Sequence, residues 1–323
     1  MELKEAVKNR VALGKRPRLI ENVLLIEGIA RAGKFLLANC LCAINDVEHT
    51  CSNGLLDNIP FMVKFKLLTP EAAEALIQNI IDNSGYDIMI GRNLNFRYDD
   101  KSCIYNSPRL KEYLDRSLNS DRDVIVEQIK NKRRYFMHIV HQGFPNIEIF
   151  LRMYSKIKVI RIERHPVDLV YSWFQRGFGR RLGRDARLFI IPIQGIKGPI
   201  PWFAHEWAED YENSSEMDRV IRFLYYINEK SKEAYVNLNM EDKKKIHTVS
   251  YERLLTETDE EMKKISIFLD KKILPGIELV KARERIPAPN PALVRNKKMN
   301  FIKKQTTPKI FSALMAMENG YEK

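Results

Sequence analysis

The chain has 323 residues, of which 45% are hydrophobic and 30% are charged, and its formal net charge at pH 7 is +12. A chain of this size can bury a large core, and so basic a surface should attract anions such as nucleotides, acidic sugars or lipid head groups. The N-terminus lacks the apolar segment of a signal peptide and no apolar run is long enough to span a membrane, so we expect a cytoplasmic protein.

The first predicted elements are a strand over residues 22–27 and a helix over residues 34–46, joined by a loop that is bounded by glycines. This is the layout of a phosphate-binding loop, because the N–H groups of the loop and of the helix N-terminus point at one place, where the helix dipole favours an anion. The alternative is an ordinary glycine turn between a buried strand and a buried helix. The residues of this candidate loop are Gly28, Ile29, Ala30, Arg31, Ala32, Gly33, Lys34 and Phe35.

The spacing of these residues also fits the loop that binds nucleoside triphosphates, with one exception. Gly28, Gly33 and Lys34 lie at the expected positions, but that loop needs Ser or Thr after the lysine, because the hydroxyl group binds Mg²⁺. The residue at this position is Phe35. The sequence therefore predicts a phosphate-binding loop without its metal ligand, and we expect no bound metal.

Mostly helices are expected between this loop and residue 134. The helix over 70–83 is strongly amphipathic and has a proline near its start, where proline is tolerated. The elements expected here are a loop over 51–60, helices over 70–83, 108–114 and 123–132, and a short strand over 86–91.

The cysteines and the basic residues do not form the pattern of a zinc site or of a nucleic-acid-binding module. None of the cysteines is in a Cys-x-x-Cys pair, and no histidine lies at zinc-finger spacing from them. We therefore expect reduced, mostly buried thiols, as in a cytoplasmic protein, and no nucleic-acid partner. The four cysteines are Cys40, Cys42, Cys51 and Cys103.

In the second half of the chain, strands alternate with helices. This alternation predicts an α/β fold with a central parallel sheet that is flanked by helices. We expect a single domain over residues 1–323, in which 183–215 form a loop or lid and 281–323 form a basic C-terminal extension. Thr258 is expected to cap a helix. The elements expected here are strands over 135–141, 156–163 and 245–251, helices over 146–155, from 167, over 216–236, 258–270 and 308–317, and a long loop over 183–205.

A second candidate phosphate site follows the strand over 156–163. The strand leads into Arg164, Pro166 starts the next helix, and Ser172 lies eight residues past Arg164. Helix geometry puts Ser172 about two turns into the helix, on a face that can meet an arginine at the end of the strand. An arginine and a hydroxyl group that converge on one point suit a phosphate monoester.

These motifs resemble those of the sulfotransferases. The strand that ends in Arg164, followed by Pro166 and Ser172, is similar to the 3′-phosphate site of that family, and Arg31-Ala32-Gly33-Lys34 is similar to its first loop. A third similar segment is VSYERLL at 249–255, and the order and spacing of the three agree with the family. The chain departs from the family pattern where Ala32, Lys34 and Phe35 replace small hydroxyl residues, so some donor contacts must come from elsewhere.

The resemblance implies a P-loop-like sulfotransferase fold and a donor, 3′-phosphoadenosine 5′-phosphosulfate (PAPS), that is used without a metal. Sulfuryl transfer resembles phosphoryl transfer, in which the protein mainly positions the reactants and stabilises charge on the leaving phosphate. Arg31 and Lys34 would do so at the 5′ end, while Arg164 and Ser172 would hold the 3′-phosphate. The resemblance also implies donor contacts from Tyr251 and Arg285.

The general base that takes the proton of the acceptor is expected at the end of the strand over 135–141. His141 ends this strand, lies 23 residues before Arg164, and titrates near neutral pH. His138 is the second choice and points to the opposite face of a regular strand. A structural role for either histidine is the alternative. Weaker candidates for the base are Asp99, Asp100 and Glu163.

The acceptor is less well defined by the sequence than the donor. The arginine-rich stretch over 176–187 favours an anionic acceptor such as a carbohydrate, and Trp202, Phe203 and Trp207 favour stacking on a sugar or another ring. Both features also fit a purely structural role. Two other functions stay open: a P-loop kinase that uses ATP and Mg²⁺, and a non-catalytic anion-binding protein of the same fold.

Overall fold

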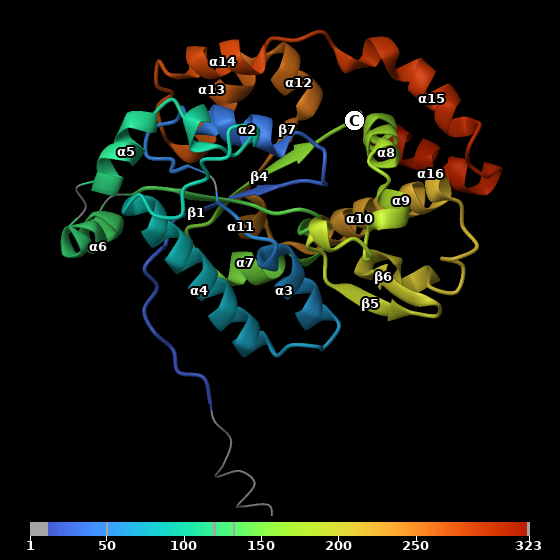
Figure 1. Cartoon of the computed structure of the whole chain (residues 1–323), viewed down its shortest axis with the longest axis horizontal. Coiled ribbons are helices and arrows are strands. Elements are labelled where there is room, and N and C mark those ends of the chain that lie inside the picture. Colours follow the sequence, from blue (N-terminus) through green and yellow to red (C-terminus); the bar gives the residue numbers. More distant parts are fainter. Residues whose placement is uncertain (1–11, 50, 119–120, 132, 322–323) are drawn as a thin grey trace, which may run out of the picture.

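Five parallel strands form the central sheet of the computed structural model, which describes residues 12–49, 51–118, 121–131 and 133–321 (Figure 1). Their order is β2-β3-β1-β4-β7, so the two motifs of the sequence follow neighbouring central strands, β1 and β4. The predicted α/β fold is confirmed. The strands are β2 (Cys51–Ser52), β3 (Phe136–Ile139), β1 (Val23–Glu27), β4 (Lys158–Glu163) and β7 (Ile246–Ser250).

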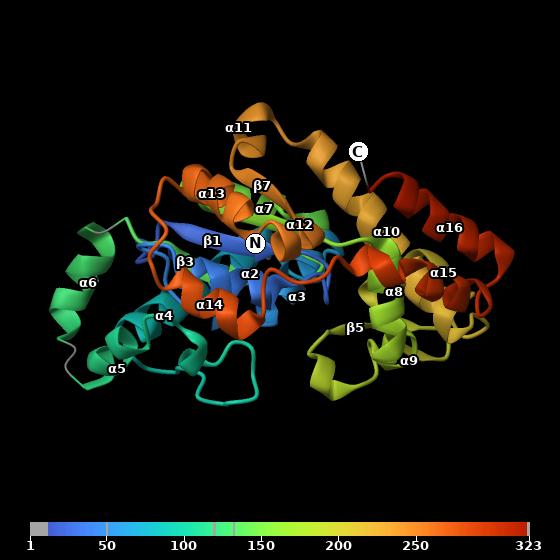
Figure 2. The ribbon, with the colours of Figure 1, turned by 90° about the horizontal axis from the view of Figure 1, so that it is seen from above.

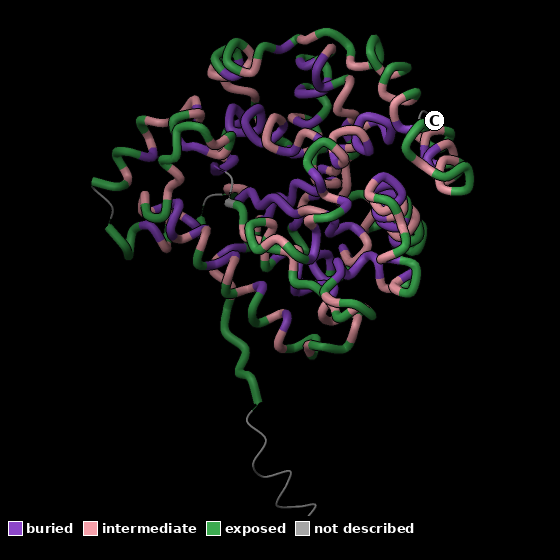
Figure 3. The backbone as a smooth tube through the Cα atoms, turned by 45° about the vertical axis from the view of Figure 1, so that its right-hand side comes forward, coloured by how far each residue is buried: buried purple, intermediate pink, exposed green. Residues whose placement is uncertain are grey.

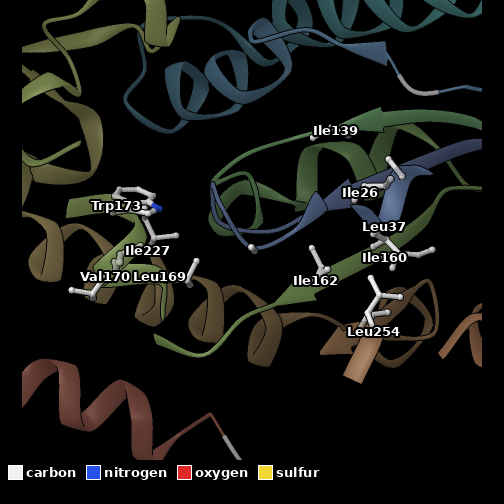
Figure 4. Close-up of a cluster of buried hydrophobic side chains, with 14 of the residues drawn as sticks. Ile26, Leu37, Ile139, Ile160, Ile162, Leu169, Val170, Trp173, Ile227 and Leu254 are labelled. Atoms are coloured by element: carbon white, nitrogen blue, oxygen red, sulfur yellow. The ribbon is translucent and has the colours of Figure 1, made fainter. Parts of the chain in front are cut away.

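The strands of the sheet alternate their side chains between two cores, as expected for a sheet that is covered on both faces. In β1, Leu24 and Ile26 enter one core while Val23 and Leu25 enter the other, and all four are fully buried. Figure 4 shows Ile26 in the first core with Leu37, and Figure 3 shows the buried backbone concentrated in the interior.

Three groups of helices surround the sheet, as Figures 1 and 2 show. The first face is covered by α2 (Lys34–Leu41), α12 (Tyr251–Thr256), α13 (Thr258–Leu269) and α14 (Ile277–Glu284). The other face carries α3 (Leu55–Lys64), α4 (Pro70–Met89), α6 (Arg122–Asn131) and α7 (Glu148–Met153), with α5 (Leu110–Leu118) beside α4. The third group is α8 (Pro166–Gln175), α9 (Phe178–Arg181), α10 (Glu216–Asn237), α15 (Arg295–Lys303) and α16 (Pro308–Asn319), and a short helix α11 (Met240–Lys243) precedes β7.

The predicted strand over 86–91 is wrong, because α4 continues to Met89. The buried residues Ile77, Ile81 and Ile88 lie four and seven residues apart and continue one helix face. Gly85 lies inside the helix at a position where only glycine leaves room for Ile20, because a Cβ atom there would come within 2.6 Å of the Ile20 side chain. The apolar run at the end of the helix is thus the last part of its buried face.

The predicted loop over 51–60 is also wrong. It contains β2 and the first half of α3, although Pro60 lies inside this helix. The helix forms because Leu56 and Ile59 lie three residues apart and are both buried in the second core, which offsets the hydrogen bond that proline cannot donate. This correction matters for the site, because α3 supplies one of its side chains.

Residues 183–215 contain regular structure where a long loop is expected. Strands β5 (Pro192–Gly195) and β6 (Gly198–Pro201) pair as an antiparallel hairpin, and a 3₁₀ helix covers Trp202–Trp207. Gly198, at the hairpin turn, has a φ of 136°, which favours glycine. A lid function of this segment stays a prediction.

Two further details of the C-terminal half differ from expectation. Thr258 does not cap α13, because α12 ends two residues earlier and the Thr258 hydroxyl donates to the Leu254 carbonyl (2.8 Å).

The stretch after residue 281 also contains α15 in addition to the expected helix, α16. α15 is held by ion pairs from Arg295 (3.3 Å) and Lys298 to the buried Asp168, which no local pattern reveals.

Cys40 and Cys103 are buried free thiols, as expected, and Cys42 is buried with its Sγ 3.4 Å from the His49 Nδ1. Within the described part of the chain, no helix combines the length and the apolar character needed to cross a membrane.

Candidate functional site

The loop between β1 and α2 is shaped by two glycines with different roles. A Cβ atom at Gly28 would lie 2.5 Å from the Ile162 carbonyl oxygen, so this glycine lets the chain pass close to β4. Gly33 has a φ of 105°, and a Cβ atom there would lie 2.3 Å from the Tyr251 ring. Gly33 precedes α2 in the left-handed region, and the first N–H groups of α2 have no side-chain cap among the described residues.

The two predicted phosphate-binding motifs come together in space. The Arg31 Nε donates to the Ser172 Oγ (3.3 Å), and the Arg164 Nη1 donates to the Arg31 carbonyl (2.8 Å). The guanidinium group of Arg164 also lies 4.5 Å above the centre of the Tyr251 ring. The structure thus joins four of the predicted residues, which come from the end of β4, from α8, from α12 and from the first loop.

This cluster carries positive charge that no carboxylate of the described residues balances. Burial, followed by the neighbouring guanidinium groups of Arg176 and Arg164, lowers the pKa of Arg31. Among the described residues, no Asp or Glu forms an ion pair with Arg31, Arg164 or Arg176. The Nε of Arg164 is buried and has no hydrogen-bond partner among the described residues. Uncompensated cations that repel one another favour an anionic ligand.

Lys34 is buried, and its ammonium group is held by the loop itself. The Nζ donates to the carbonyls of Gly28 and Ile29, the latter at 3.0 Å. Burial lowers the pKa of Lys34 to about 8, and the nearby carboxylates of Glu27 and Asp57 partly oppose this effect. In this structure Lys34 therefore stabilises the loop, while Arg31 is more exposed to solvent.

A cavity of about 710 Å³ lies next to this cluster, at the carboxyl edge of the sheet. Ligands of open α/β sheets bind at this edge. One wall is formed by Arg31, Arg164 and Tyr251, and an apolar wall by Phe178 and the segment 188–190. The cavity therefore offers a cationic region and an apolar region side by side.

His141 lines this cavity and contacts a carboxylate that the sequence analysis did not select. The backbone N–H of His141 donates to Asp57 in α3, and the His141 Nδ1 lies 3.3 Å from the Asp57 Oδ2. Burial and the charge of Lys34 lower the pKa of His141, and Asp57 partly opposes them. With Nδ1 next to Asp57, Nε2 is the ring nitrogen that can take a proton. No sequence motif marks Asp57, since it lies in the stretch where a loop is expected.

The other base candidates lie elsewhere. His138 is 1% exposed, neither of its ring nitrogens has a hydrogen-bond partner among the described residues, and burial lowers its pKa to about 4. Glu163 pairs with Arg161 (3.1 Å) and lines a neighbouring cavity of about 200 Å³, which shares Arg164 with the larger cavity. Asp99 is exposed, and Asp100 accepts a hydrogen bond from the Ser102 hydroxyl (3.3 Å).

Arg285, which is also predicted to bind the donor, is exposed at the C-terminal end of α14. It does not line the 710 Å³ cavity, although its neighbour Glu284 does. The remaining loop residues, Ile29, Ala30, Ala32 and Phe35, lie where the sequence predicts them, between β1 and the first turn of α2.

The residues that favour a carbohydrate acceptor have structural partners. Trp202 and Phe203 are at most 3% exposed and belong to the first core, as does Trp207. The arginines of the 176–187 stretch other than Arg176 pair with carboxylates on the protein. These pairs are Arg180–Glu216, Arg181–Asp185, Arg184–Glu212 and Arg187–Asp185. Neither feature therefore points to an anionic sugar.

Comparison with known proteins identifies a domain that covers most of the chain. The model of the sulfotransferase domain matches residues 23–286. No curated protein sequence matches the chain.

Several solved structures resemble the chain at low identity. The sulfotransferase domain from the curacin biosynthetic pathway is 12% identical, with 94% of this chain and 98% of that chain covered and a TM-score of 0.48. The sulfotransferase domain of the olefin synthase from Synechococcus PCC 7002 is 11% identical, with coverages of 97% and 99% and a TM-score of 0.46. The sulfotransferase STF9 from Mycobacterium avium is 10% identical, with coverages of 94% and 76% and a TM-score of 0.45.

Proposed function

The chain belongs to the sulfotransferase family, and we propose that it transfers a sulfuryl group from PAPS to a hydroxyl group of an acceptor. The observation that carries this proposal is the cluster of Arg31, Arg164 and Ser172, which lies at the carboxyl edge of the sheet without a balancing carboxylate among the described residues. A donor with phosphate groups at both ends of a nucleoside supplies the missing negative charge.

Each part of the cluster has a separate role in this proposal. Arg164, whose buried Nε has no hydrogen-bond partner among the described residues, and Ser172 bind the 3′-phosphate, since an arginine fork and a hydroxyl group suit a phosphate monoester. Arg31 and the first N–H groups of α2 bind the 5′-phosphate. Tyr251, which packs on both Gly33 and Arg164, contacts the nucleoside. Lys34 fixes the loop by binding its carbonyls.

His141 acts as the general base in the transfer step. The acceptor oxygen attacks the sulfur atom while the bond between sulfur and the 5′-phosphate oxygen breaks, and adenosine 3′,5′-bisphosphate leaves. The acceptor proton passes to Nε2 of His141, and Asp57 orients the ring and stabilises its charged form. Arg31 stabilises the charge that develops on the leaving phosphate.

We also propose that residues 1–323 form one cytoplasmic domain, with 281–323 as a C-terminal extension. The free thiols of Cys40 and Cys103 support a reducing compartment. The extension packs onto the rest through α15 and its ion pairs to Asp168, which supports a single unit.

We predict that the purified protein binds adenosine 3′,5′-bisphosphate without a metal and binds ATP with Mg²⁺ weakly or not at all. Phe35 cannot ligate Mg²⁺, whereas the arginine cluster suits a second phosphate. Calorimetric titration with each ligand, with and without EDTA, measures both affinities, and turnover of PAPS is followed in the same buffers. Tight binding of ATP with Mg²⁺ and no affinity for the bisphosphate would favour a kinase and contradict the proposal. Bisphosphate binding without turnover of PAPS would favour a non-catalytic protein.

Removal of Arg164 or Ser172 should weaken the bisphosphate far more than adenosine 5′-phosphate. The lost contact is charge-assisted, so Arg164→Ala should cost about 1.5–3 kcal/mol of binding free energy, and Ser172→Ala about 0.5–1.5 kcal/mol. Calorimetry with the two nucleotides gives the comparison, and Arg180→Ala is a matched control because Arg180 pairs with Glu216 outside the cavity. Equal losses for both nucleotides would show that these residues do not read the 3′-phosphate.

A further inference from the structure

An apolar groove continues the cavity of the candidate site towards solvent. It has a volume of about 400 Å³ and lies between the N-terminal end of α3 and the segment that leads into β5. Gly54, Phe189 and Ile190 line both the cavity and the groove, so the two adjoin each other. Leu55, Ile191 and Pro192 line the groove alone.

The groove and the candidate base are held by neighbouring residues of one helix. Asp57 of α3 contacts His141, and the next residue, Asn58, binds the segment that forms the groove. The buried Asn58 donates to the Phe189 carbonyl (2.9 Å) and accepts from the Ile191 N–H (3.0 Å). The apolar wall is therefore fixed relative to the imidazole of His141.

The side chains of this wall are large and apolar, and yet they are exposed to solvent in the free protein. Phe189 is 77% exposed, and Leu55 and Ile191 are also exposed, although each lies against the groove. Large apolar side chains that gather around a concave surface mark a site where apolar ligand surface is buried. The aromatic residues that favour a carbohydrate acceptor in the sequence are buried, and the arginines that favour one are paired with carboxylates.

We propose that the acceptor is an alcohol with an extended apolar body, which runs from His141 along Phe189 into the groove beside Leu55 and Ile191. The inference rests on the proposed function, because the hydroxyl group of this alcohol is the one that attacks the sulfur atom. Its proton passes to His141, its oxygen becomes the sulfate ester oxygen, and adenosine 3′,5′-bisphosphate leaves. The apolar body is the part that distinguishes this acceptor from a sugar.

The test is a series of straight-chain primary alcohols from 1-butanol to 1-decanol, with methyl β-glucoside as the sugar comparison. kcat/KM is measured from the release of adenosine 3′,5′-bisphosphate from PAPS. We expect kcat/KM to rise about fourfold with each added methylene group until the groove is filled, because each one leaves water for an apolar wall. A flat series, or a preference for the glucoside, would overturn the inference.

The variants Leu55→Gln and Ile191→Ser test the groove itself, since neither side chain lines the cavity. They should flatten the series for the longer alcohols and leave 1-butanol almost unchanged. Ile267→Ser, at an exposed site of α13 away from the groove, is the matched control and should keep the rise of the wild type. A series that is unchanged in both groove variants would contradict the inference.

A binding measurement separates this inference from the proposed function. Calorimetry with 1-octanol is repeated on wild type and variants with adenosine 3′,5′-bisphosphate bound. Weaker octanol binding in Leu55→Gln and Ile191→Ser supports the groove even if no sulfate is transferred, and equal binding in all three proteins rejects it. Failure of the bisphosphate to bind rejects the proposed function instead, and octanol is then titrated alone with the same two outcomes.

Discussion

His141→Ala should lower kcat by about 10²- to 10⁴-fold and leave the affinity for adenosine 3′,5′-bisphosphate nearly unchanged. The reason is that His141 lines the cavity with its Nδ1 next to Asp57, so that Nε2 can take the acceptor proton, while the arginine cluster binds the donor. Steady-state kinetics with a saturating acceptor gives kcat, and calorimetry gives the affinity.

The pH profile gives a second test of the same residue. Burial and the charge of Lys34 lower the pKa of His141 from its ordinary value of 6.5, so the neutral base persists below that pH and kcat should fall only in more acidic buffer. Asp57 raises this pKa, so Asp57→Asn should shift the acidic limb to still lower pH while reducing kcat. The limb should vanish in His141→Ala.

Other outcomes would assign the role of general base to a different residue. If His141→Ala keeps a near-normal kcat and His138→Ala, checked for folding by circular dichroism, does not, the base is His138. The burial of His138 and its pKa of about 4 argue against this result. If neither variant changes kcat, Asp57, a carboxylate that lines the cavity, becomes the candidate.

The sequence was most informative where one segment carries a whole motif. Arg164 and Ser172 share one strand–helix unit, and Gly33 lies in a strand–loop–helix unit, so spacing alone predicts both places. Arg31 meets Ser172 because β1 and β4 are neighbours in the sheet, and neither motif alone predicts this strand order. The family resemblance implied in advance that both motifs bind the same donor.

The parts that the sequence did not reveal depend on contacts between distant residues. Asp57 meets His141 across 84 positions, and Asn58 meets Phe189 across 131. Both lie in a stretch whose glycine and proline favour a loop, although burial of Leu56 and Ile59 makes it a helix. No local pattern encodes such partners. The same applies to the paired arginines of the 176–187 stretch, whose carboxylate partners include Glu212 and Glu216.

Arg31→Met should lower kcat by about 10²- to 10³-fold, because Arg31 is proposed to stabilise the charge that grows on the leaving phosphate. Methionine keeps the unbranched apolar part of the side chain and, like arginine, has a Cβ atom, so the strain of the left-handed backbone (φ 74°) stays comparable. The affinity for adenosine 3′,5′-bisphosphate should fall as well, because the 5′-phosphate of the released product carries in full the charge that is only partly developed in the transition state.

Arg187→Met is the matched control for this experiment. Arg187 also lines the cavity and its loss changes the net charge equally, but its guanidinium group pairs with Asp185 (2.8 Å) and its side chain is 80% exposed. Its kcat should therefore stay within a few-fold of the wild type, as for an exposed ion pair. An equal loss in both variants would show that only the overall positive field matters. A normal kcat in Arg31→Met, with weaker binding of the bisphosphate, would make Arg31 a donor-binding residue that does not act on the transition state.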